Sequence, residues 1–209
     1  IDYYDFSTHM IYLKDENSFA SEINKRDTFY VYANRQKIYR GDIIPNFSSY
    51  MPSEPYITDP FFYSHNILPI NFMHAFDDSG NPMNEDPRGD TRIIEALKRN
   101  GQFHTGLELK IKSVSYISNT DVSVEIEIYN PDSYNYYIPD PDKMEISSFH
   151  YFTNGLYITH LSPYAVYYND IETSNPGQWK MEWLSLLKTK ERKSFTINYN
   201  KFENIPPGQ

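Results

Sequence analysis

The stretch Thr120–Tyr137, TDVSVEIEIYNPDSYNYY, carries the clearest structural pattern in this chain. Its branched apolar residues fall at every second position: Val122, Val124, Ile126 and Ile128. A period of two predicts a β-strand with one face in a core and the other in water, as in antiparallel sheets. The turn-forming Asn130-Pro131-Asp132-Ser133 should end this strand, because proline cannot donate to a ladder. A second, aromatic-rich strand is predicted from Tyr134 to Ile138.

The segment before this strand predicts its neighbour in the sheet. In Leu107–Ile117 apolar residues alternate with charged ones, and the alternation slips at Ser113, which predicts a β-bulge there. The outward lysines of this strand should lie near Glu125 and Glu127. Further extended runs are expected after Pro139, separated by Pro, Gly and Asn turns: Ser147–Phe152, Leu156–Leu161, Tyr164–Tyr168, Trp179–Leu187 and Ser194–Tyr199. Such spacing favours an antiparallel β-sandwich.

A family resemblance rests on four features of this half: the strand into Asn130-Pro131, the charged turn Lys188–Lys193, the run SFTINY, and Ile205-Pro206-Pro207-Gly208. Together they resemble the layout of immunoglobulin-like β-sandwich modules in secreted bacterial proteins and lipoproteins. The resemblance implies such a fold for residues 105–209 and a location outside the cytoplasm. A Pro-Gly turn in these modules commonly introduces one more strand, whereas this sequence stops at Gln209, so we expect an unpaired sheet edge.

The N-terminal residues, 1–88, are expected to form a second β-rich part. Thr8–Leu13 predicts a strand. Thr28–Ala33 and Gln36–Arg40 predict a hairpin around Asn34-Arg35, with Val31 opposite Ile38 and Tyr30 opposite Tyr39. Gly41–Pro60 contains four prolines and is expected to be an irregular loop over the sheet. Phe61–Met73 should return to extended structure.

One short helix is predicted at about Asp90–Arg99, within a connector at residues 89–104. Asp86 and Pro87 are favourable start residues, and Gly101 favours termination. Arg88-Gly89-Asp90 is also the tripeptide that adhesion receptors bind, but its place at a helix start is a sufficient explanation. The fold class predicted for the whole chain is therefore mostly β, with an N-terminal β-rich part, this helix and an immunoglobulin-like sandwich.

Composition excludes several functions. The net charge of -9 argues against a nucleic-acid partner, and no apolar run approaches the length of a transmembrane span. The chain begins at Ile1 without an apolar leader, so we expect a mature or trimmed form, and a lipid anchor is compatible with the sequence. The family resemblance implies a location in the periplasm or on the cell surface. Cysteine is absent, which excludes a disulfide framework and a thiol nucleophile.

No residue pattern predicts catalysis, a metal site or a cofactor. The six histidines lack zinc-site spacing, and nucleophile-elbow, phosphate-loop and dinucleotide motifs are absent. The acidic run Asp77–Asp86 offers oxygen ligands, but Gly80, Pro82 and Arg88 break the calcium-loop pattern. A solvated acidic turn is the favoured interpretation, and we expect a protein that is not an enzyme.

Aromatic residues are the candidates for ligand binding, since the chain is tyrosine-rich with 20 Tyr and 13 Phe. Trp179 and Trp183 would share one strand face, which is either core or a flat strip for sugar rings. Lys180 and Glu182 point the other way, which favours the core interpretation. Tyr134, Tyr136 and Tyr137 are the other candidates. The leading hypothesis is an extracytoplasmic, non-enzymatic binding or structural module with a protein or glycan partner. Its alternatives are a carbohydrate-binding surface protein and a proteinase inhibitor that uses the Gly41–Pro60 loop.

Overall fold

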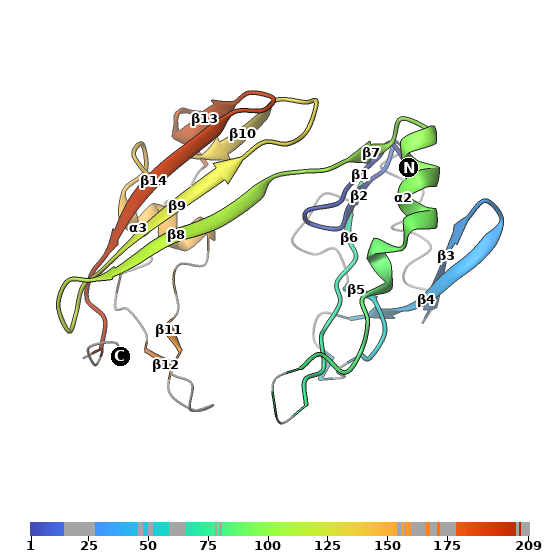
Figure 1. The fold of residues 1–209 in the computed structure, drawn as a ribbon, viewed down its shortest axis with the longest axis horizontal. Helices are drawn as coiled ribbons and strands as arrows, with labels where there is room; N and C mark the ends of the chain where they lie inside the picture. Colours follow the sequence, from blue (N-terminus) through green and yellow to red (C-terminus); the bar gives the residue numbers. More distant parts are fainter. Residues whose placement is uncertain are drawn as a thin grey trace. The chain divides into compact units, whose positions relative to one another are not determined.

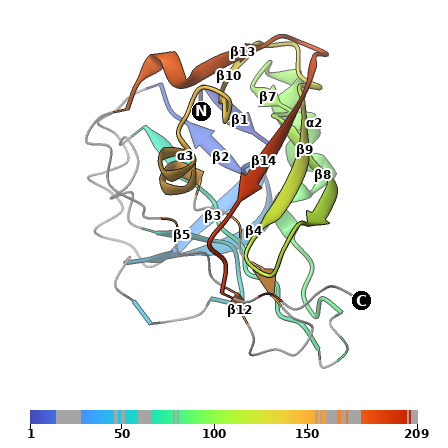
Figure 2. The same cartoon turned by 90° about the vertical axis from the view of Figure 1, so that its left-hand side faces the viewer.

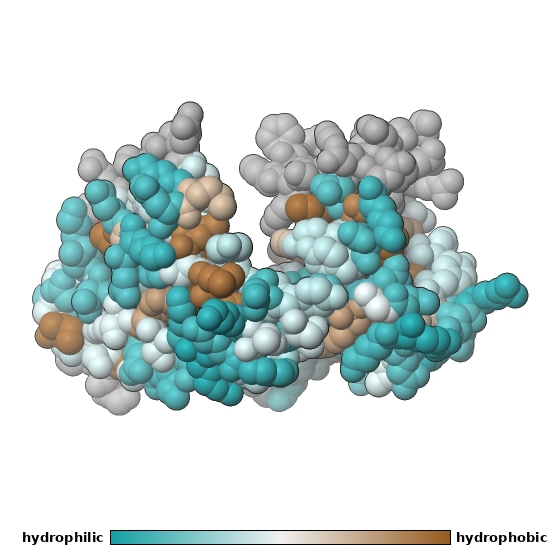
Figure 3. All heavy atoms as spheres, turned by 90° about the horizontal axis from the view of Figure 1, so that it is seen from above, coloured by the Kyte–Doolittle hydropathy of each residue, from teal (hydrophilic) through white to brown (hydrophobic). Residues whose placement is uncertain are grey.

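The computed structural model describes residues 1–14, 28–45, 48–49, 52–58, 66–77, 79, 81–153, 156, 158–159, 166–167, 171, 179–203 and 205. The chain folds mostly as β-strands with two α-helices, and it divides into two compact units, Ile1–Gly106 and Leu107–Gln209 (Figure 1). No helix in these residues is both long enough and apolar enough to cross a bilayer. On the face drawn in Figure 3, apolar side chains reach the surface in small groups separated by hydrophilic ones.

The first unit contains a four-stranded sheet in the order β6-β2-β1-β7. Its strands are β1 (Tyr3–Asp5), β2 (Met10–Tyr12), β6 (Ile67–Pro69) and β7 (Phe103–His104). β1 and β7 run parallel, whereas the other pairs are antiparallel. The strand predicted over Thr8–Leu13 is confirmed in its second half as β2. Residues 61–65 of the predicted extended run lie outside the described part.

The predicted hairpin is present as β3 (Thr28–Ala33) and β4 (Gln36–Ile44). Asn34 and Arg35 form its turn with φ angles of 53° and 66°. This left-handed conformation at both central residues is the one that a two-residue hairpin turn favours, because it matches the twist of the strands.

The register of this hairpin differs from the prediction. A bulge at Val31 and Tyr32 inserts one extra residue of β4, so Val31 pairs with Tyr39 and Tyr30 with Arg40. The predicted pairing of Val31 with Ile38 is therefore wrong by one residue. The alternation of side chains does not reveal the bulge, because aromatic and aliphatic residues are mixed on both strands.

The proline-rich segment Gly41–Pro60 is irregular only in part. β4 continues to Ile44, and β5 (Tyr56–Thr58) pairs with it in parallel. Pro45 directly follows β4 and Pro55 directly precedes β5, so these prolines bound the strands instead of interrupting them. The prediction of a loop throughout is wrong at both ends. Residues 46–47, 50–51 and 59–60 lie outside the described part.

The predicted helix is confirmed as α2 (Thr91–Arg99), preceded by a 3₁₀ turn, η1 (Pro87–Gly89). Asp86 caps η1, and the Asp90 carboxylate accepts a hydrogen bond from the Arg92 amide at 2.8 Å. These caps satisfy amides that have no partner within the helix. Ile93 and Leu97 are the buried residues of α2.

The core of the first unit joins α2 to both sheets. Its buried residues are Tyr4, Ala33, Tyr39, Ile93 and Leu97. They come from β1, β3, β4 and α2, so neither sheet buries its apolar face alone. The helix and the hairpin therefore cover the four-stranded sheet, and the space between them decides where a ligand can bind.

The second unit is built on the predicted central strand, β9 (Val122–Tyr129), which lies in a three-stranded antiparallel sheet of order β14-β9-β8 (Figure 1). Its neighbours are β8 (Glu108–Tyr116) and β14 (Arg192–Tyr199). The predicted bulge is confirmed between Ile111 and Ser113. Lys110 lies opposite Glu127, as expected, and Arg192 donates to the same carboxylate at 2.9 Å.

A two-stranded sheet packs against this one. β10 (Tyr136–Pro139) and β13 (Leu184–Leu187) pair antiparallel, and Ile138 and Leu187 form a buried cluster with Phe195 of β14. β11 (Ile158–Thr159) and β12 (Val166–Tyr167) form a further short pair within the two predicted strands there. Most of residues 154–178, which include the rest of those predicted strands, lie outside the described part.

The second unit also contains a helix where an extended run was expected. α3 (Ile146–Thr153) packs against the three-stranded sheet through Phe149, which clusters with Val124 and Ile197 (Figures 1 and 2). The prediction of a single short helix is therefore wrong. Aromatic residues are common in strands, but burial of Phe149 in the core stabilises a helix here, because tertiary packing outweighs weak local propensity.

Candidate functional site

The two tryptophans do not form the flat strip that a strand would give. Residues Met181–Trp183 form a 3₁₀ turn, η2, and only Leu184–Leu187 is a strand. Trp183 is 6% exposed and belongs to the core, whereas Trp179 is 41% exposed. Their ring centroids lie 5.8 Å apart with the planes at 86°. The strand prediction is wrong for 179–183, and the core interpretation is confirmed for Trp183 alone.

Phe152 joins the tryptophans in an edge-to-face cluster. Its ring lies 4.8 Å from that of Trp179 and 5.1 Å from that of Tyr151, with near-perpendicular planes in both pairs. Tyr151, Phe152 and Trp179 are partly exposed. Rings in this arrangement stabilise one another, but they do not present the coplanar faces on which successive sugar rings would stack.

The three candidate tyrosines differ in exposure and do not share one strand face. Tyr137 is 66% exposed and Tyr134 is 52% exposed, whereas Tyr136 is half-buried. The Tyr136 hydroxyl donates to Asp132 at 2.8 Å and so holds the turn before β10. Adjacent residues of a strand point to opposite faces, which separates Tyr136 from Tyr137. No ring contact links these tyrosines to the tryptophans among the described residues.

The acidic segment and the adhesion tripeptide are used internally. The Asp77 carboxylate accepts hydrogen bonds from the amides of Ser79 and Asn81 at 2.9 and 2.8 Å, as in a tight polar turn. Arg88 binds Asp86 through two donors, and its side chain is only 13% exposed. A receptor that needs a free arginine would find this one already paired.

The β8 edge is the most exposed apolar surface of the second unit. All nine of its residues are exposed, including the apolar Leu109, Ile111 and Val114, which pair with apolar residues of β9. β8 carries Lys110 and Lys112 and the bulge, which are features that protect edge strands from pairing with another strand. This edge is therefore a weaker candidate for a partner strand than its apolar content suggests.

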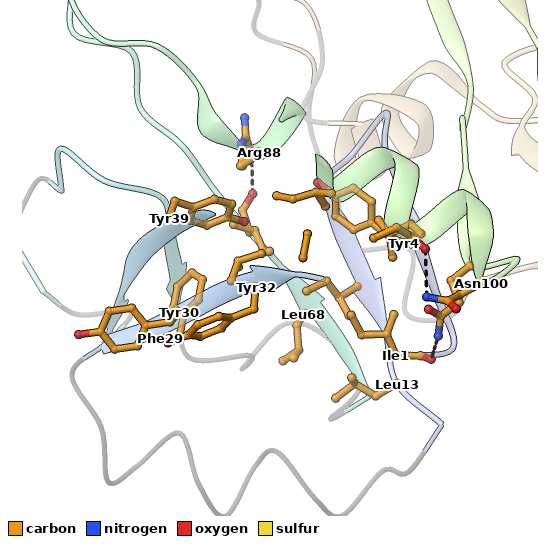
Figure 4. A pocket seen from close by; sticks show the side chains of 18 of the residues that line it. Ile1, Tyr4, Leu13, Phe29, Tyr30, Tyr32, Tyr39, Leu68, Arg88 and Asn100 are labelled. Carbon is orange, nitrogen blue, oxygen red and sulfur yellow. Dashed lines mark hydrogen bonds between the residues drawn. The ribbon is translucent and has the colours of Figure 1, made fainter. Parts of the chain in front are cut away.

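The strongest candidate site is a cavity of about 560 Å³ in the first unit, between α2, the hairpin and the four-stranded sheet (Figure 4). Its apolar wall includes Ile57, Leu68 and Ile70 from the sheets and Ile93 and Leu97 from α2, all of which are buried. Tyr30 and Tyr32 line it as well and are exposed, so they form part of its rim. Ligand sites are typically cavities of this size with mainly apolar walls.

One side of the cavity is polar. Arg88 and Tyr39 line it together there, as Figure 4 shows. Behind them, the Tyr4 hydroxyl forms a hydrogen bond of 2.5 Å with Nδ1 of His9. Burial raises the pKa values of the Tyr4 and Tyr39 hydroxyls, so both stay protonated at neutral pH.

The ionisation of the groups near this side follows from burial and charge. Burial, and then the positive charge of Arg88, lower the pKa of His9 to about 4, which leaves its ring neutral at pH 7. Burial alone would raise the pKa of Asp86, but hydrogen bonds from Arg88 hold it below its usual range. Asp86 and Arg88 are therefore both ionised, and their charges cancel.

The opposite side of the cavity carries amides. Gln102 donates through Nε2 to the Ile1 carbonyl at 2.6 Å, and Asn100 donates through Nδ2 to the Ala96 carbonyl at 3.0 Å (Figure 4). The bond from Gln102 ties Ile1 to the segment after α2, whereas the bond from Asn100 closes the C-terminal end of the helix. Sequence reasoning missed this site, because its residues come from or adjoin β1 to β6, η1 and α2, and no local pattern marks them. The aromatic run TFYVYA is the one local signal that could have directed attention to it.

Comparison with known proteins adds no relative: no family model, no curated protein and no solved structure matches the chain.

Proposed function

We propose that the protein is a non-enzymatic binding module whose N-terminal unit holds a small, mainly apolar ligand in the cavity of Figure 4. The observation that carries the proposal is the cavity itself, about 560 Å³ in volume and lined by aliphatic and tyrosine side chains with few polar groups. Apolar walls favour a ligand through the hydrophobic effect, and isolated polar groups orient it.

The state of the polar groups supports binding and not catalysis. Arg88 is paired with Asp86, and Tyr4 with His9. A general acid or base must reach a reacting group with its proton or lone pair. Among the described lining residues, no ionisable side chain offers a free carboxylate or imidazole to the cavity, so binding is the better supported activity.

The second unit is proposed to be an immunoglobulin-like module that works outside the cytoplasm. The resemblance of residues 105–209 carries this proposal, and the packing of Ile138 and Leu187 on Phe195 across two antiparallel sheets supports it. Glycan binding is the second candidate function: Trp179 and Phe152 are partly exposed, but their perpendicular rings offer no flat strip for successive sugar rings. The inhibitor alternative is less favoured, since β4 and β5 hold both ends of the proline-rich segment in a sheet.

A cavity-filling substitution tests the leading proposal. Ala96 lies on α2, is half-buried and lines the cavity, so Ala96→Phe should place a ring inside it. We expect a neutral fluorescent dye such as N-phenyl-1-naphthylamine to bind the unmodified protein and to bind the variant at least about 10-fold more weakly, since most of the buried apolar contact would be lost.

Ala75→Phe is the matched control, because Ala75 is exposed and lies outside the described cavity wall. It should leave dye affinity unchanged. Circular dichroism would verify that both variants are folded. Absence of dye binding to the unmodified protein, or equal binding by folded Ala96→Phe, would remove the basis of the proposal.

A further inference from the structure

The charge in the cavity wall is already compensated. Arg88 is the one charged side chain among the described lining residues. Its Nε donates to Oδ1 of Asp86 at 2.9 Å, and its Nη2 donates to Oδ2 at 2.6 Å. The remaining terminal nitrogen, Nη1, donates to the Ile70 carbonyl at 2.6 Å. A two-point pair of this kind fixes the guanidinium plane and neutralises its charge, so no described side chain of the cavity wall offers an uncompensated cation to an anionic ligand.

The neighbouring side chains add no net charge either. His9 lies behind Tyr4, and its ring nitrogen Nδ1 is occupied by the Tyr4 hydroxyl. The amides on the opposite side, Asn100 and Gln102, donate to backbone carbonyls. A buried ion without a partner of opposite charge is strongly unfavourable, and this applies to ammonium groups as well as to carboxylates.

The hydroxyl of Tyr39 is a polar group of the cavity wall that is available to a ligand. Its side chain is 7% exposed and lines the cavity on the same side as Arg88 (Figure 4). Its hydroxyl makes no hydrogen bond to the residues that the structure describes. The hydroxyl oxygen is not one of the described buried polar atoms that lack a partner, so solvent reaches it through the cavity. A ligand that displaces this solvent must replace the hydrogen bond, because a hydroxyl buried without a partner is costly. A ligand in the cavity can provide that partner.

We propose that the cavity selects an uncharged ligand, with an aliphatic or aromatic body and one neutral hydroxyl or carbonyl group hydrogen-bonded to the Tyr39 hydroxyl, and that it rejects carboxylates and amines with the same body. This inference rests on the proposed function, because it assumes that the cavity binds a ligand. It adds the chemical class of that ligand and its orientation, with the polar group toward Tyr39 and the apolar body along Leu68 and Leu97.

Three probes with one body and different head groups test the class. They are 1-decanol, decanoate and decylammonium, used at pH 8, where the acid is ionised and the amine is protonated. Each probe would be used to displace the neutral dye from the full chain, with the ions below their micelle concentrations and decanol below its solubility limit. We expect decanol to displace the dye at about 10-fold lower concentration than either ion, because the ions must leave water without gaining a partner.

The outcomes separate the two proposals. Equal displacement by all three probes, or tighter binding of decanoate or decylammonium, would overturn the neutral-ligand inference and leave the binding function standing. Failure of the dye and of every probe to bind would overturn both. Preference for decanol, lost together with dye binding in Ala96→Phe, would support both and place the binding in the cavity.

The orientation has its own test. Tyr39→Phe removes the hydroxyl but keeps the ring, so the affinity for decanol should fall about 5- to 10-fold through loss of one hydrogen bond. Tyr137→Phe is the matched control, because Tyr137 is exposed on the second unit. Unchanged decanol affinity in a folded Tyr39→Phe variant would overturn the assignment of Tyr39 as the anchor.

Discussion

Gly101 and Gly106 both adopt left-handed backbone conformations, with φ of 66° and 78°, but their surroundings differ. A Cβ added at Gly101 would meet nothing within 4 Å. A Cβ added at Gly106 would clash with the Ser7 hydroxyl and lie 2.5 Å from the Asp5 carboxylate. Asp5 itself accepts hydrogen bonds from Ser7 and Thr8, so the clash would disturb a tight turn after β1.

These surroundings predict different costs for the same substitution. Gly101→Ala should lower the free energy of unfolding by about 1 kcal/mol, through backbone strain alone. Gly106→Ala should lower it by about 3 kcal/mol, because steric overlap is added to the strain. Urea unfolding of the first unit, followed by circular dichroism, measures both. Equal costs at the two positions would contradict the predicted clash.

For single residues, the sequence predicted which side chains are buried better than it predicted which of them line a binding site. The polar neighbours Lys180 and Glu182 favour a core position for both tryptophans, and the structure confirms this for Trp183 but not for Trp179. Tyr39 could not be identified as a binding residue. The alternation of side chains places Tyr39 on one face of β4. The bulge in the hairpin decides which residues that face contacts, and no local pattern predicted the bulge.

The β3–β4 hairpin shows an element held by an unfavourable turn residue. Arg35 has a φ of 66°, which costs a residue with a Cβ about 1 kcal/mol, and glycine avoids this cost. Arg35→Gly should therefore raise the free energy of unfolding by about 0.5 kcal/mol, after subtraction of the greater entropy of glycine in the unfolded chain.

Arg35→Ala is the control for the turn, since alanine retains the Cβ and should give no gain. Thermal unfolding of the three proteins would rank them. A higher stability for the alanine variant than for the glycine variant would show that backbone strain at Arg35 is not the controlling factor.

Elements with a strict alternation were predicted well. β8 and β9 have period-two patterns, and even the bulge between them was visible as a slip in parity. α3 was missed because its sequence, ISSFHYFT, combines residues of high strand propensity with no strand alternation. The burial of Phe149 against the sheet, which is a tertiary effect, makes it a helix.

At the scale of the whole molecule, each unit has a core of its own. Ile93 and Leu97 belong to the core of the first unit, whereas Val124, Trp183 and Ile197 belong to that of the second. Both tryptophans of the chain lie in the second unit. Tryptophan fluorescence therefore reports on one unit, and far-ultraviolet circular dichroism reports on both.

A core substitution in the first unit and one in the second unit should have different effects on circular dichroism and on tryptophan fluorescence. Leu97→Ala should destabilise the first unit by about 3 kcal/mol and shift part of the circular dichroism transition in urea, without shifting the tryptophan transition. Ile197→Ala should shift the tryptophan transition. A tryptophan transition that moves with Leu97→Ala would contradict separate unfolding of the two cores.

The sequence by itself determined the β-rich class, the central strand with its antiparallel neighbours, the hairpin turn and the capped helix, because each depends on periodicity or turn chemistry within a few residues. Only the tertiary structure decided the hairpin register, the helix at Ile146–Thr153 and the 3₁₀ turn at Met181–Trp183. The cavity around Tyr39 and Arg88 belongs to this second group. Its walls come from segments far apart in the chain, and long-range packing, which no local pattern encodes, brings them together.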